Sequence, residues 1–324
     1  MKTIKIGLLG LGNIGTGTYK TLEMNRKEIV STLGTSIDIV KILEKDVDRK
    51  RDITVSKEKF TQNPDDIFKD PEIDIVIELL GGIEPAASFM LAAMENGKHV
   101  VTANKAAVAA NYSKLAETAI TNNVLFKYEA SVGGGIPILG TLDGPLRANK
   151  FEEVLGIVNG TTNYILYMMT AEGMDYSSAL KQAQELGFAE ADPTADVEGI
   201  DAANKLSILM ALMFDKYVPP TEIPTTGITG VTKEEIAVAT AQNCKIKLIA
   251  RATKLEDGTI EYSVSPMKLK DSHPLSGINK EFNAVFVKGN AVGELMFYGK
   301  GAGPLPTGSA VMGDVIEISK AILK

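Results

Sequence analysis

The chain has 324 residues, of which 44% are hydrophobic and 23% charged, and its formal net charge is −7. A chain of this length and composition is expected to form a globular protein with two connected domains. The acidic balance argues against a general nucleic-acid or anionic-membrane binder, because both need a basic face. A small anionic ligand needs only a local basic pocket and is not excluded.

Cysteine and histidine are rare. The single cysteine, Cys244, excludes an intrachain disulfide and a cysteine-cluster metal site, and it is typical of a reducing compartment. With only two histidines, His99 and His273, a zinc site is not expected. The N-terminal residues lack a signal-peptide pattern, and no apolar run reaches the roughly 18 residues of a membrane span. The sequence therefore predicts a soluble cytoplasmic protein with no membrane or nucleic-acid partner.

The first part of the chain alternates apolar strands with amphipathic helices. One helix is expected from Asn13 to about Thr32, and strands are expected at residues 4–10, 37–43, 74–81, 99–105 and 124–131. Such an alternation is typical of βαβ units in a parallel sheet covered on both faces. We therefore predict an α/β fold whose residues 1–130 form a Rossmann-type, doubly wound dinucleotide-binding domain.

The pattern then changes. A strand is expected at residues 151–160 and helices at 161–173, 176–187 and 200–214. Two hairpins follow, formed by KIKLIARATKL with IEYSVSPMKL and by NAVFVKG with NAVGELMFYG. These elements predict an α+β domain over residues 131–300. An amphipathic helix in residues 301–324 is expected to return to the first domain.

The segment GLGNIG places Gly10, Gly12 and Gly15 in a G-x-G-x-x-G pattern between a strand and a helix. The glycines permit a tight turn, close approach of a pyrophosphate and close helix–strand packing, while the helix N-terminus supplies amide donors. A glycine-rich turn can be purely structural, but the strand–turn–helix context favours a dinucleotide site. Asn13 and Ile14, in the same loop, are predicted coenzyme contacts.

The segment LEKDVDRKR after the second strand bears on the choice of coenzyme. Glu44 could accept a hydrogen bond from a ribose 2′-hydroxyl, which favours NAD. The basic side chains that follow could instead hold a 2′-phosphate. A solvated loop is the alternative for any one of them. The whole cluster predicts NADP, with NAD tolerated, and consists of Lys45, Arg49, Lys50 and Arg51.

Carboxylates crowd the segment between Glu190 and Asp201, which leads to Lys205. Asp201 and Lys205 are four residues apart on an apolar helix, so the lysine is expected to be buried and either paired or proton-shuttling. A plain ion pair is the alternative. Glu190, Asp192 and Asp196 would suit a substrate ammonium group, although Asp192 or Asp196 could instead cap a helix.

The segment TANK ends the strand predicted at residues 99–105, and ligands of open α/β sheets lie beyond the carboxyl ends of the strands. Thr102 and Lys105 are therefore predicted to reach the nicotinamide or the substrate. His99 opens the same strand at the wrong end for catalysis, and His273 lies in a loop. A 2-hydroxy-acid dehydrogenase, which needs a catalytic histidine, is not favoured.

In this order, the motifs GLGNIG, TANK, YEASVGGGIPI, GIVNGTTNYIL, LGFAEADPTADVEGIDAANK and FYGKGAGPLPTGSAVMGD resemble homoserine dehydrogenases over nearly the whole chain. The fifth motif is specific to that family. The resemblance implies NAD(P)-dependent interconversion of L-homoserine and L-aspartate 4-semialdehyde, in the biosynthesis of threonine, methionine and isoleucine. It also implies that the second domain binds substrate and forms a homodimer or homotetramer.

The resemblance assigns roles to individual residues. Lys205 would be the proton donor and acceptor, with Asp201 as partner of a substrate hydroxyl or water. Lys105 would be a second lysine beside coenzyme and substrate. Glu190 would hold the substrate amino group.

Further contacts follow from the same resemblance. Gly160 and Thr161 would touch the substrate through their backbones, and Gly301 would touch the nicotinamide. A monovalent cation, expected to be sodium, would be bound mostly by backbone carbonyls, which suit a hard cation. Its ligands would be Glu129, Val132, Gly134 and Ile136.

Many family members carry a C-terminal regulatory ACT domain that this sequence lacks, so no inhibition by threonine through such a domain is expected. Other functions stay open. A phosphorylating aldehyde dehydrogenase needs a thiol nucleophile with a base, and Cys244 has no histidine near it in sequence. A dinucleotide-sensing regulator without turnover would not need both Lys105 and Lys205. Another NAD(P)-dependent oxidoreductase of amino-acid semialdehydes is the third alternative.

Overall fold

The computed structural model describes residues 3–324 and forms two units. The first unit consists of Met1–Gly135 together with Ala302–Lys324, and the second is the intervening segment Ile136–Gly301. The C-terminal helix thus belongs to the first unit.

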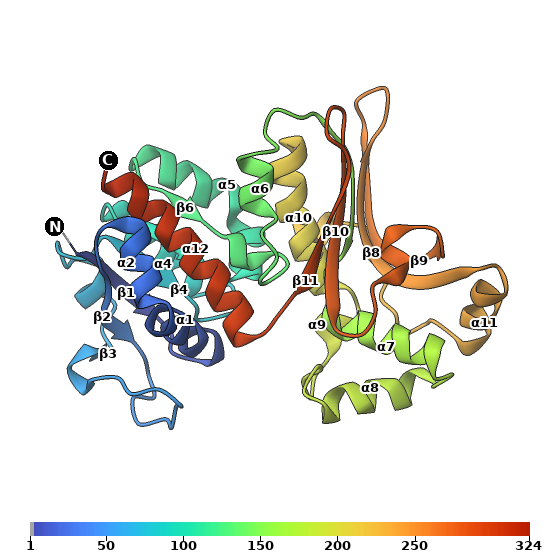
Figure 1. Cartoon of the computed structure of the whole chain (residues 1–324), viewed down its shortest axis with the longest axis horizontal. Helices are drawn as coiled ribbons and strands as arrows, with labels where there is room; N and C mark the ends of the chain where they lie inside the picture. The colour runs from blue at the N-terminus through green and yellow to red at the C-terminus, as the bar shows by residue number, and fades with distance from the viewer. Residues whose placement is uncertain (1–2) are drawn as a thin grey trace. The chain divides into compact units, whose positions relative to one another are not determined.

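The first unit contains a six-stranded parallel sheet in the order β3-β2-β1-β4-β5-β6 (Figure 1). This order is that of doubly wound dinucleotide-binding folds, so the predicted fold class is confirmed. The strands are short and rich in buried isoleucine and valine, which suits a sheet covered on both faces. They are β1 (Ile4–Leu9), β2 (Ile37–Leu43), β3 (Phe60–Thr61), β4 (Ile75–Glu78), β5 (His99–Thr102) and β6 (Phe126–Lys127).

Several predicted bounds in this unit are wrong; the strands expected at 74–81 and 99–105 end at Glu78 and Thr102. The single helix expected from Asn13 is two helices, because Asn25 leaves the helical conformation and both its backbone N–H and its side-chain amide donate to Thr21 O. The strand expected at 124–131 is only β6, since Glu129–Ser131 forms a short 3₁₀ helix, η2. The helices are α1 (Asn13–Met24), α2 (Arg26–Leu33), α3 (Asp65–Phe68), α4 (Ala86–Glu95), α5 (Lys105–Thr121) and α12 (Pro304–Ile322).

Apolar side chains cover both faces of this sheet. On one face, Ile75 and Ile77 pack in a cluster to which α12 contributes Val311 and Val315, while Val76 packs in a second cluster with α4 and α5. The helices α1 and α12 lie side by side in front of the sheet (Figure 1). Their backbones approach closely at Gly17 and Gly308, where a β-carbon on Gly308 would lie 2.8 Å from the Gly17 backbone.

The second unit contains a five-stranded antiparallel sheet in the order β11-β10-β7-β8-β9 (Figure 1). Both predicted hairpins are present, as β8 with β9 and β10 with β11. The strands are β7 (Phe151–Ile157), β8 (Cys244–Lys254), β9 (Ile260–Lys270), β10 (Phe282–Gly289) and β11 (Gly293–Lys300).

Three helices of the second unit begin at side-chain caps, and α10 begins after Gly199. Asn159 caps α7, Asp175 caps α8, and Thr232 with Glu235 forms a capping box at α11. None of the helices in the described part of the chain combines the length and apolarity that crossing a membrane requires. The helices are α6 (Leu139–Asp143), α7 (Gly160–Ala171), α8 (Tyr176–Glu185), α9 (Thr194–Val197), α10 (Ile200–Phe214) and α11 (Lys233–Ala241).

Candidate active site and coenzyme loop

Lys205 lies in the second turn of α10 and is almost fully buried, with 7% of its surface exposed. Its Nζ donates to Asp201 Oδ2 at 2.6 Å and to the backbone carbonyl of Val158 at 2.6 Å. The predicted burial and pairing of this lysine are confirmed. An ammonium group has three N–H donors, and these two contacts fix its position at the N-terminal end of α10.

Asn159 connects the two carboxylates of this site, and the sequence analysis did not identify it. Its Oδ1 accepts the Thr162 N–H at 2.9 Å, so it caps α7. Its Nδ2 donates to Asp196 Oδ1 at 2.7 Å and to Asp201 Oδ2 at 2.9 Å. An asparagine followed by glycine at a helix start is a capping signal, but the sequence does not indicate which carboxylates its amide would bridge.

Asp196 lies beside Asp201 and is half-buried. Burial raises the pKa of Asp196, and the negative charge of Asp201 raises it further, whereas hydrogen bonds from Asn159 and Thr161 and the charge of Lys205 oppose the shift. Two carboxylates and one ammonium group therefore share a small, partly desolvated volume. Such a perturbed cluster is a candidate functional site.

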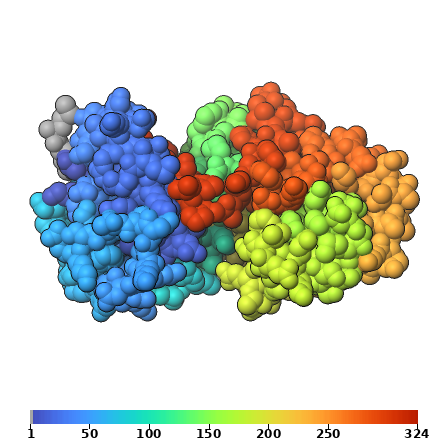
Figure 2. All heavy atoms as spheres, turned by 60° about the horizontal axis from the view of Figure 1, so that its bottom comes forward, coloured from blue at the N-terminus to red at the C-terminus, as the bar shows by residue number. Residues whose placement is uncertain are grey.

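Glu190 lies on the surface segment between α8 and α9, which is part of the yellow-green face in Figure 2. Its backbone carbonyl accepts from Gln184 Nε2 at 3.1 Å. Within residues 3–324 no hydrogen bond or ion pair engages its carboxylate. This carboxylate is therefore open to a ligand from solvent.

The other predicted substrate contacts make packing interactions within the second unit. Thr161 Oγ1 donates to the Phe188 carbonyl at 2.6 Å. A β-carbon on Gly160 would lie 2.7 Å from the Glu281 carbonyl oxygen, so close packing alone requires glycine there. Asp192 does not cap α9, whose N-cap is Pro193 without a side-chain cap. Its Oδ1 instead accepts from both the backbone N–H and the hydroxyl of Thr194, two residues further on.

In the first unit, the three glycines of the G-x-G-x-x-G loop have different surroundings. Gly10 has a φ of +93°, and a β-carbon on Gly15 would lie 2.2 Å from Gly10 O. These two glycines are required by the turn and by close packing. Gly12 differs, because a β-carbon there would meet nothing within 4 Å. The open side of Gly12 is where a pyrophosphate would approach the α1 N-terminus, next to the exposed Asn13 and the half-buried Ile14.

Glu44 and Arg51, both weighed as coenzyme contacts, instead hold each other and the glycine loop. The Arg51 guanidinium lies 3.0 Å from Glu44 Oε2 and donates through Nε to Leu11 O at 2.8 Å. The Leu11 N–H donates to Glu44 Oε2 at 3.0 Å. Burial opposes ionisation of Glu44, but the N–H groups of Asp46 and Leu11 and the charge of Arg51 outweigh it and lower its pKa. Lys45, Arg49 and Lys50 are exposed.

Thr102 and Lys105 lie at the carboxyl end of β5, where α5 begins. Thr102 Oγ1 donates to Glu78 Oε2 at 2.6 Å, so this hydroxyl is used inside the fold. Glu78 is fully buried at the end of β4, and burial raises its pKa. Lys105 is only half-buried and is the first residue of α5.

The predicted cation ligands lie on the segment after β6. Glu129, Val132 and Gly134 belong to the first unit, and Ile136 begins the second. The Glu129 N–H donates to Asp314 Oδ2 at 2.9 Å, and its carbonyl accepts from Val132 N at 3.3 Å. Among the described residues no three His, Cys, Asp or Glu side chains are grouped to hold a metal, so a cation here would depend on backbone carbonyls.

Gly301, the predicted nicotinamide contact, packs inside the second unit. A β-carbon there would lie 1.9 Å from Asn283 Nδ2, so the buried Asn283 side chain alone requires glycine.

The thiol that an aldehyde dehydrogenase of the phosphorylating type would need, Cys244, begins β8 and donates to Gln242 O at 3.4 Å.

Comparison with known proteins assigns the family. The family model described as "Homoserine dehydrogenase" matches residues 137–316, and "Homoserine dehydrogenase, NAD binding domain" matches residues 10–129. The homoserine dehydrogenase of Bacillus subtilis (strain 168) is 45% identical over 321 residues, which cover 99% of this chain and 74% of that protein. The chain belongs to the homoserine dehydrogenase family.

Solved structures of homoserine dehydrogenases have the same fold. One from Thiobacillus denitrificans superposes with a TM-score of 0.95 at 42% identity, covering 99% of this chain and 74% of that chain. A putative homoserine dehydrogenase from Archaeoglobus fulgidus has a TM-score of 0.87 at 33% identity, with 97% and 99% covered. A hyperthermophilic archaeal homoserine dehydrogenase in complex with NADPH has a TM-score of 0.80 at 26% identity, with 98% and 97% covered. The family assignment makes the chain an oxidoreductase with an NAD(P)-binding domain.

Proposed function

We propose that the chain interconverts L-homoserine and L-aspartate 4-semialdehyde with Lys205 as the acid–base group. The observation that carries the assignment is the position of this lysine, which is buried and held by Asp201 and the Val158 carbonyl at 2.6 Å each. A positioned ammonium group in a water-poor site is suited to proton transfer. The family assignment supplies the substrate and the redox chemistry.

In this proposal each part of the Lys205 cluster has one task. When bound, a nicotinamide coenzyme supplies or accepts the hydride. Lys205 protonates the oxygen of the aldehyde as it becomes an alkoxide, and takes the proton back from the homoserine hydroxyl in the reverse direction. Asp201 orients the lysine, and Asn159 holds Asp201 from the other side.

The substrate amino acid needs a partner for its ammonium group, and we assign Glu190 to it. The carboxylate of Glu190 is exposed and has no partner in residues 3–324, whereas Asp196 is already bound by Asn159. Asp196 is assigned a supporting role through Asn159. Gly160 and Thr161 at the start of α7 are assigned backbone contacts with the substrate, and Lys105 a position beside coenzyme and substrate.

For the coenzyme we propose NADP, with NAD tolerated. The open side of Gly12 leaves room for the pyrophosphate. Glu44, the group expected to select NAD, is neutralised by Arg51, while Lys45, Arg49 and Lys50 are exposed on the same loop. A 2′-phosphate therefore meets positive charge here. Asn13, Ile14, Thr102 and Gly301 are proposed as further coenzyme contacts.

Two more features of the family resemblance stay proposals. One is a sodium ion held by backbone carbonyls of Glu129, Val132, Gly134 and Ile136, where consecutive glycines with positive φ, Gly133 and Gly134, turn the chain sharply. The other is a homodimer formed by the second unit. Its edge strand β11 exposes 40% of Met296 and 53% of Tyr298, and exposed apolar side chains on an edge strand are typical of an interface.

Replacing Lys205 by methionine or alanine tests the proposal, with homoserine and NADP⁺ as substrates and reduced nicotinamide as the readout. We expect kcat to fall by roughly 10²–10⁴, while the Kd of the coenzyme, measured by fluorescence titration, changes little. Lys181→Met is the control, since Lys181 is exposed on α8 and pairs only loosely with Glu185 at 4.0 Å. Near-normal turnover of both Lys205 variants would show that Lys205 forms only a structural ion pair with Asp201.

A further inference from the structure

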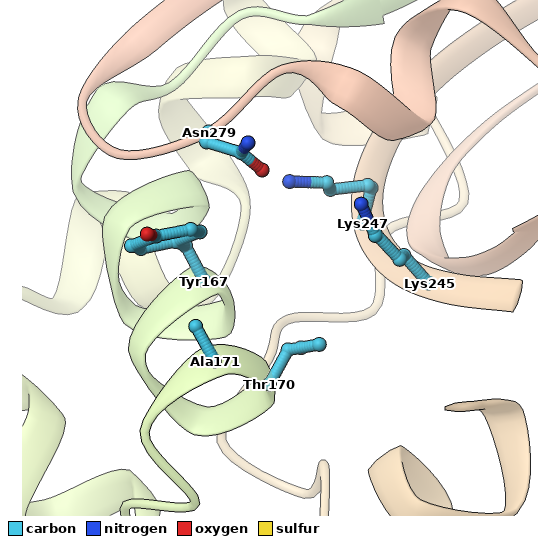
Figure 3. Close-up of a pocket in the computed structure, with 6 residues that line it drawn as sticks. All are labelled: Tyr167, Thr170, Ala171, Lys245, Lys247 and Asn279. Atoms are coloured by element: carbon cyan, nitrogen blue, oxygen red, sulfur yellow. The ribbon is translucent and has the colours of Figure 1, made fainter. Parts of the chain in front are cut away.

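A second group of lysines lies apart from Lys205, in a pocket on the second unit. The pocket has a volume of about 170 Å³ and lies between α7 and β8. Figure 3 shows the side chain of Lys247 extending from the strand toward Asn279, with Tyr167 and Thr170 on the facing helix. The lining residues are Tyr167, Thr170, Ala171, Lys245, Lys247 and Asn279.

Lys247 is buried in the strand, with 2% of its surface exposed. Its Nζ donates to Asn163 Oδ1 at 2.9 Å and to the Ile278 carbonyl, and no carboxylate pairs with it among the described residues. Burial lowers the pKa of Lys247, and together with the positive charge of Lys245 it brings the value to about 7. A buried lysine held only by neutral acceptors is costly in free energy, because its charge is desolvated without an opposite charge.

Lys245 adds a second positive charge beside Lys247, which disfavours the charged form of Lys247 further. It is two residues before Lys247 on β8, so both side chains leave the same face of the strand. No acidic side chain lines the pocket. Two ammonium groups that converge on one hollow without a carboxylate favour an anion in it. The neutral polar side chains of Tyr167 and Asn279 add hydrogen-bonding groups to the same wall.

We propose that this pocket binds a small oxyanion, a carboxylate or phosphate group, between Lys245 and Lys247. An anion there supplies the opposite charge that the fold lacks. It accepts the third N–H of the Lys247 ammonium group, which the contacts with Asn163 and Ile278 do not use. The volume is close to that of an engineered cavity that holds benzene, so the ligand has on the order of six or seven heavy atoms. The Lys205 cluster and the glycine loop take no part in this site.

The pocket is connected to the candidate active site through α7. Asn163, the acceptor for Lys247, donates through Nδ2 to three backbone carbonyls, of Ile278, Lys280 and Phe282, at 2.9–3.3 Å. It lies one turn after Asn159, which caps the same helix and bridges Asp196 and Asp201. An anion on Lys247 therefore acts on a helix that also carries active-site contacts.

The test is binding of inorganic phosphate and of malonate to the full chain, measured by calorimetry and by the shift of the thermal unfolding midpoint. The buffer contains neither phosphate nor carboxylates, and sodium chloride keeps the ionic strength constant. Lys245→Met is the main variant, because it leaves the hydrogen bonds of Lys247 intact. Lys268→Met is the matched control: it is an exposed lysine opposite Ile246 on the neighbouring strand, hence on the other face of the sheet.

We expect saturable binding of at least one of the two anions, weakened at least about tenfold by Lys245→Met and unchanged by Lys268→Met. The anion that binds more tightly identifies the natural ligand as a phosphate or a carboxylate. Absence of saturable binding of both anions to the unmodified chain would overturn the proposal. So would equal binding by the Lys245 variant, because it would place the anion elsewhere on the protein.

Discussion

The Arg51 guanidinium lies 3.0 Å from the Glu44 carboxylate, and both side chains hydrogen-bond the backbone of Leu11, inside the glycine loop. The pair therefore ties the end of β2 to the loop that is proposed to receive the pyrophosphate. Only 7% of the Arg51 side chain and 15% of the Glu44 side chain are exposed. Arg51 thus has a structural role that the exposed Lys45 and Arg49 do not share.

This difference predicts two kinds of coenzyme variant. Replacing Lys45 and Arg49 together by alanine should weaken NADP(H) by about 1–3 kcal/mol, the worth of charge-assisted contacts to a 2′-phosphate, and leave NAD(H) nearly unchanged. Arg51→Met should weaken both coenzymes by similar factors, because it leaves Glu44 without its partner and loosens the loop. Titrating each variant with both reduced coenzymes decides the matter. Equal losses for the double variant would show that Lys45 and Arg49 do not read the phosphate.

The glycine loop gives a prediction that separates folding from binding. Gly12→Ala places a methyl group in open space, so the variant should unfold at nearly the temperature of the unmodified chain yet bind coenzyme poorly. Gly15→Ala should instead destabilise the fold, because its β-carbon would lie 2.2 Å from Gly10 O. Thermal unfolding without coenzyme and coenzyme titration are the two measurements. Full coenzyme affinity of Gly12→Ala would show that the pyrophosphate lies elsewhere.

Glu190→Gln removes a charge and keeps the shape of the side chain. If Glu190 binds the substrate ammonium group, KM for homoserine should rise roughly 10–100-fold, corresponding to about 1.5–3 kcal/mol for a hydrogen bond between charged groups. The unfolding temperature should not change. Glu185→Gln is the control, since Glu185 is exposed near the end of α8. An unchanged KM would show that Glu190 does not bind the substrate ammonium group.

The pKa of Lys247 predicts how stability depends on pH. Its folded-state value, about 7, lies below the 10.5 of the unfolded chain, so the unfolded state binds more protons between these values. Between pH 7 and pH 9 the unmodified chain should therefore gain about 2 kcal/mol of stability relative to Lys247→Met. Urea unfolding of both proteins, in buffers free of oxyanions, measures this difference. A difference independent of pH would mean that Lys247 stays charged in the fold.

Local patterns in the sequence were enough to predict the elements that depend on near neighbours. The glycine loop, the order of strands and helices and the burial of Lys205 follow from spacing and composition. The helix break at Asn25 was not predicted, although asparagine favours helix ends and turns. The strand after Val124 was predicted too long because the Glu129 N–H hydrogen-bonds the distant Asp314, which the local sequence does not indicate.

Contacts between distant residues could not be predicted. Glu44 looked like a ribose ligand because nothing in its neighbourhood indicates that Arg51 folds back on it. Asn159 and Asp201 are 42 positions apart, and Lys247 and Asn163 are 84 apart. Hydrogen bonds of this kind have no periodicity, and only the folded sheet and helices bring their partners together.

The packing of α12 on α1 has a consequence for how the protein is made. Val311, Met312, Val315 and Ile318 complete one of the two apolar clusters of the first unit, although β1 of that cluster is synthesised first. At about 5–20 residues per second, roughly 10–30 s pass on the ribosome between the two parts of this unit. During that time the apolar face of β1 and β4 lacks the part of its cover that α12 supplies, although Leu22 of α1 and Ile29 of α2 already pack in the same cluster. The first unit can therefore complete its packing only after the whole second unit has been synthesised.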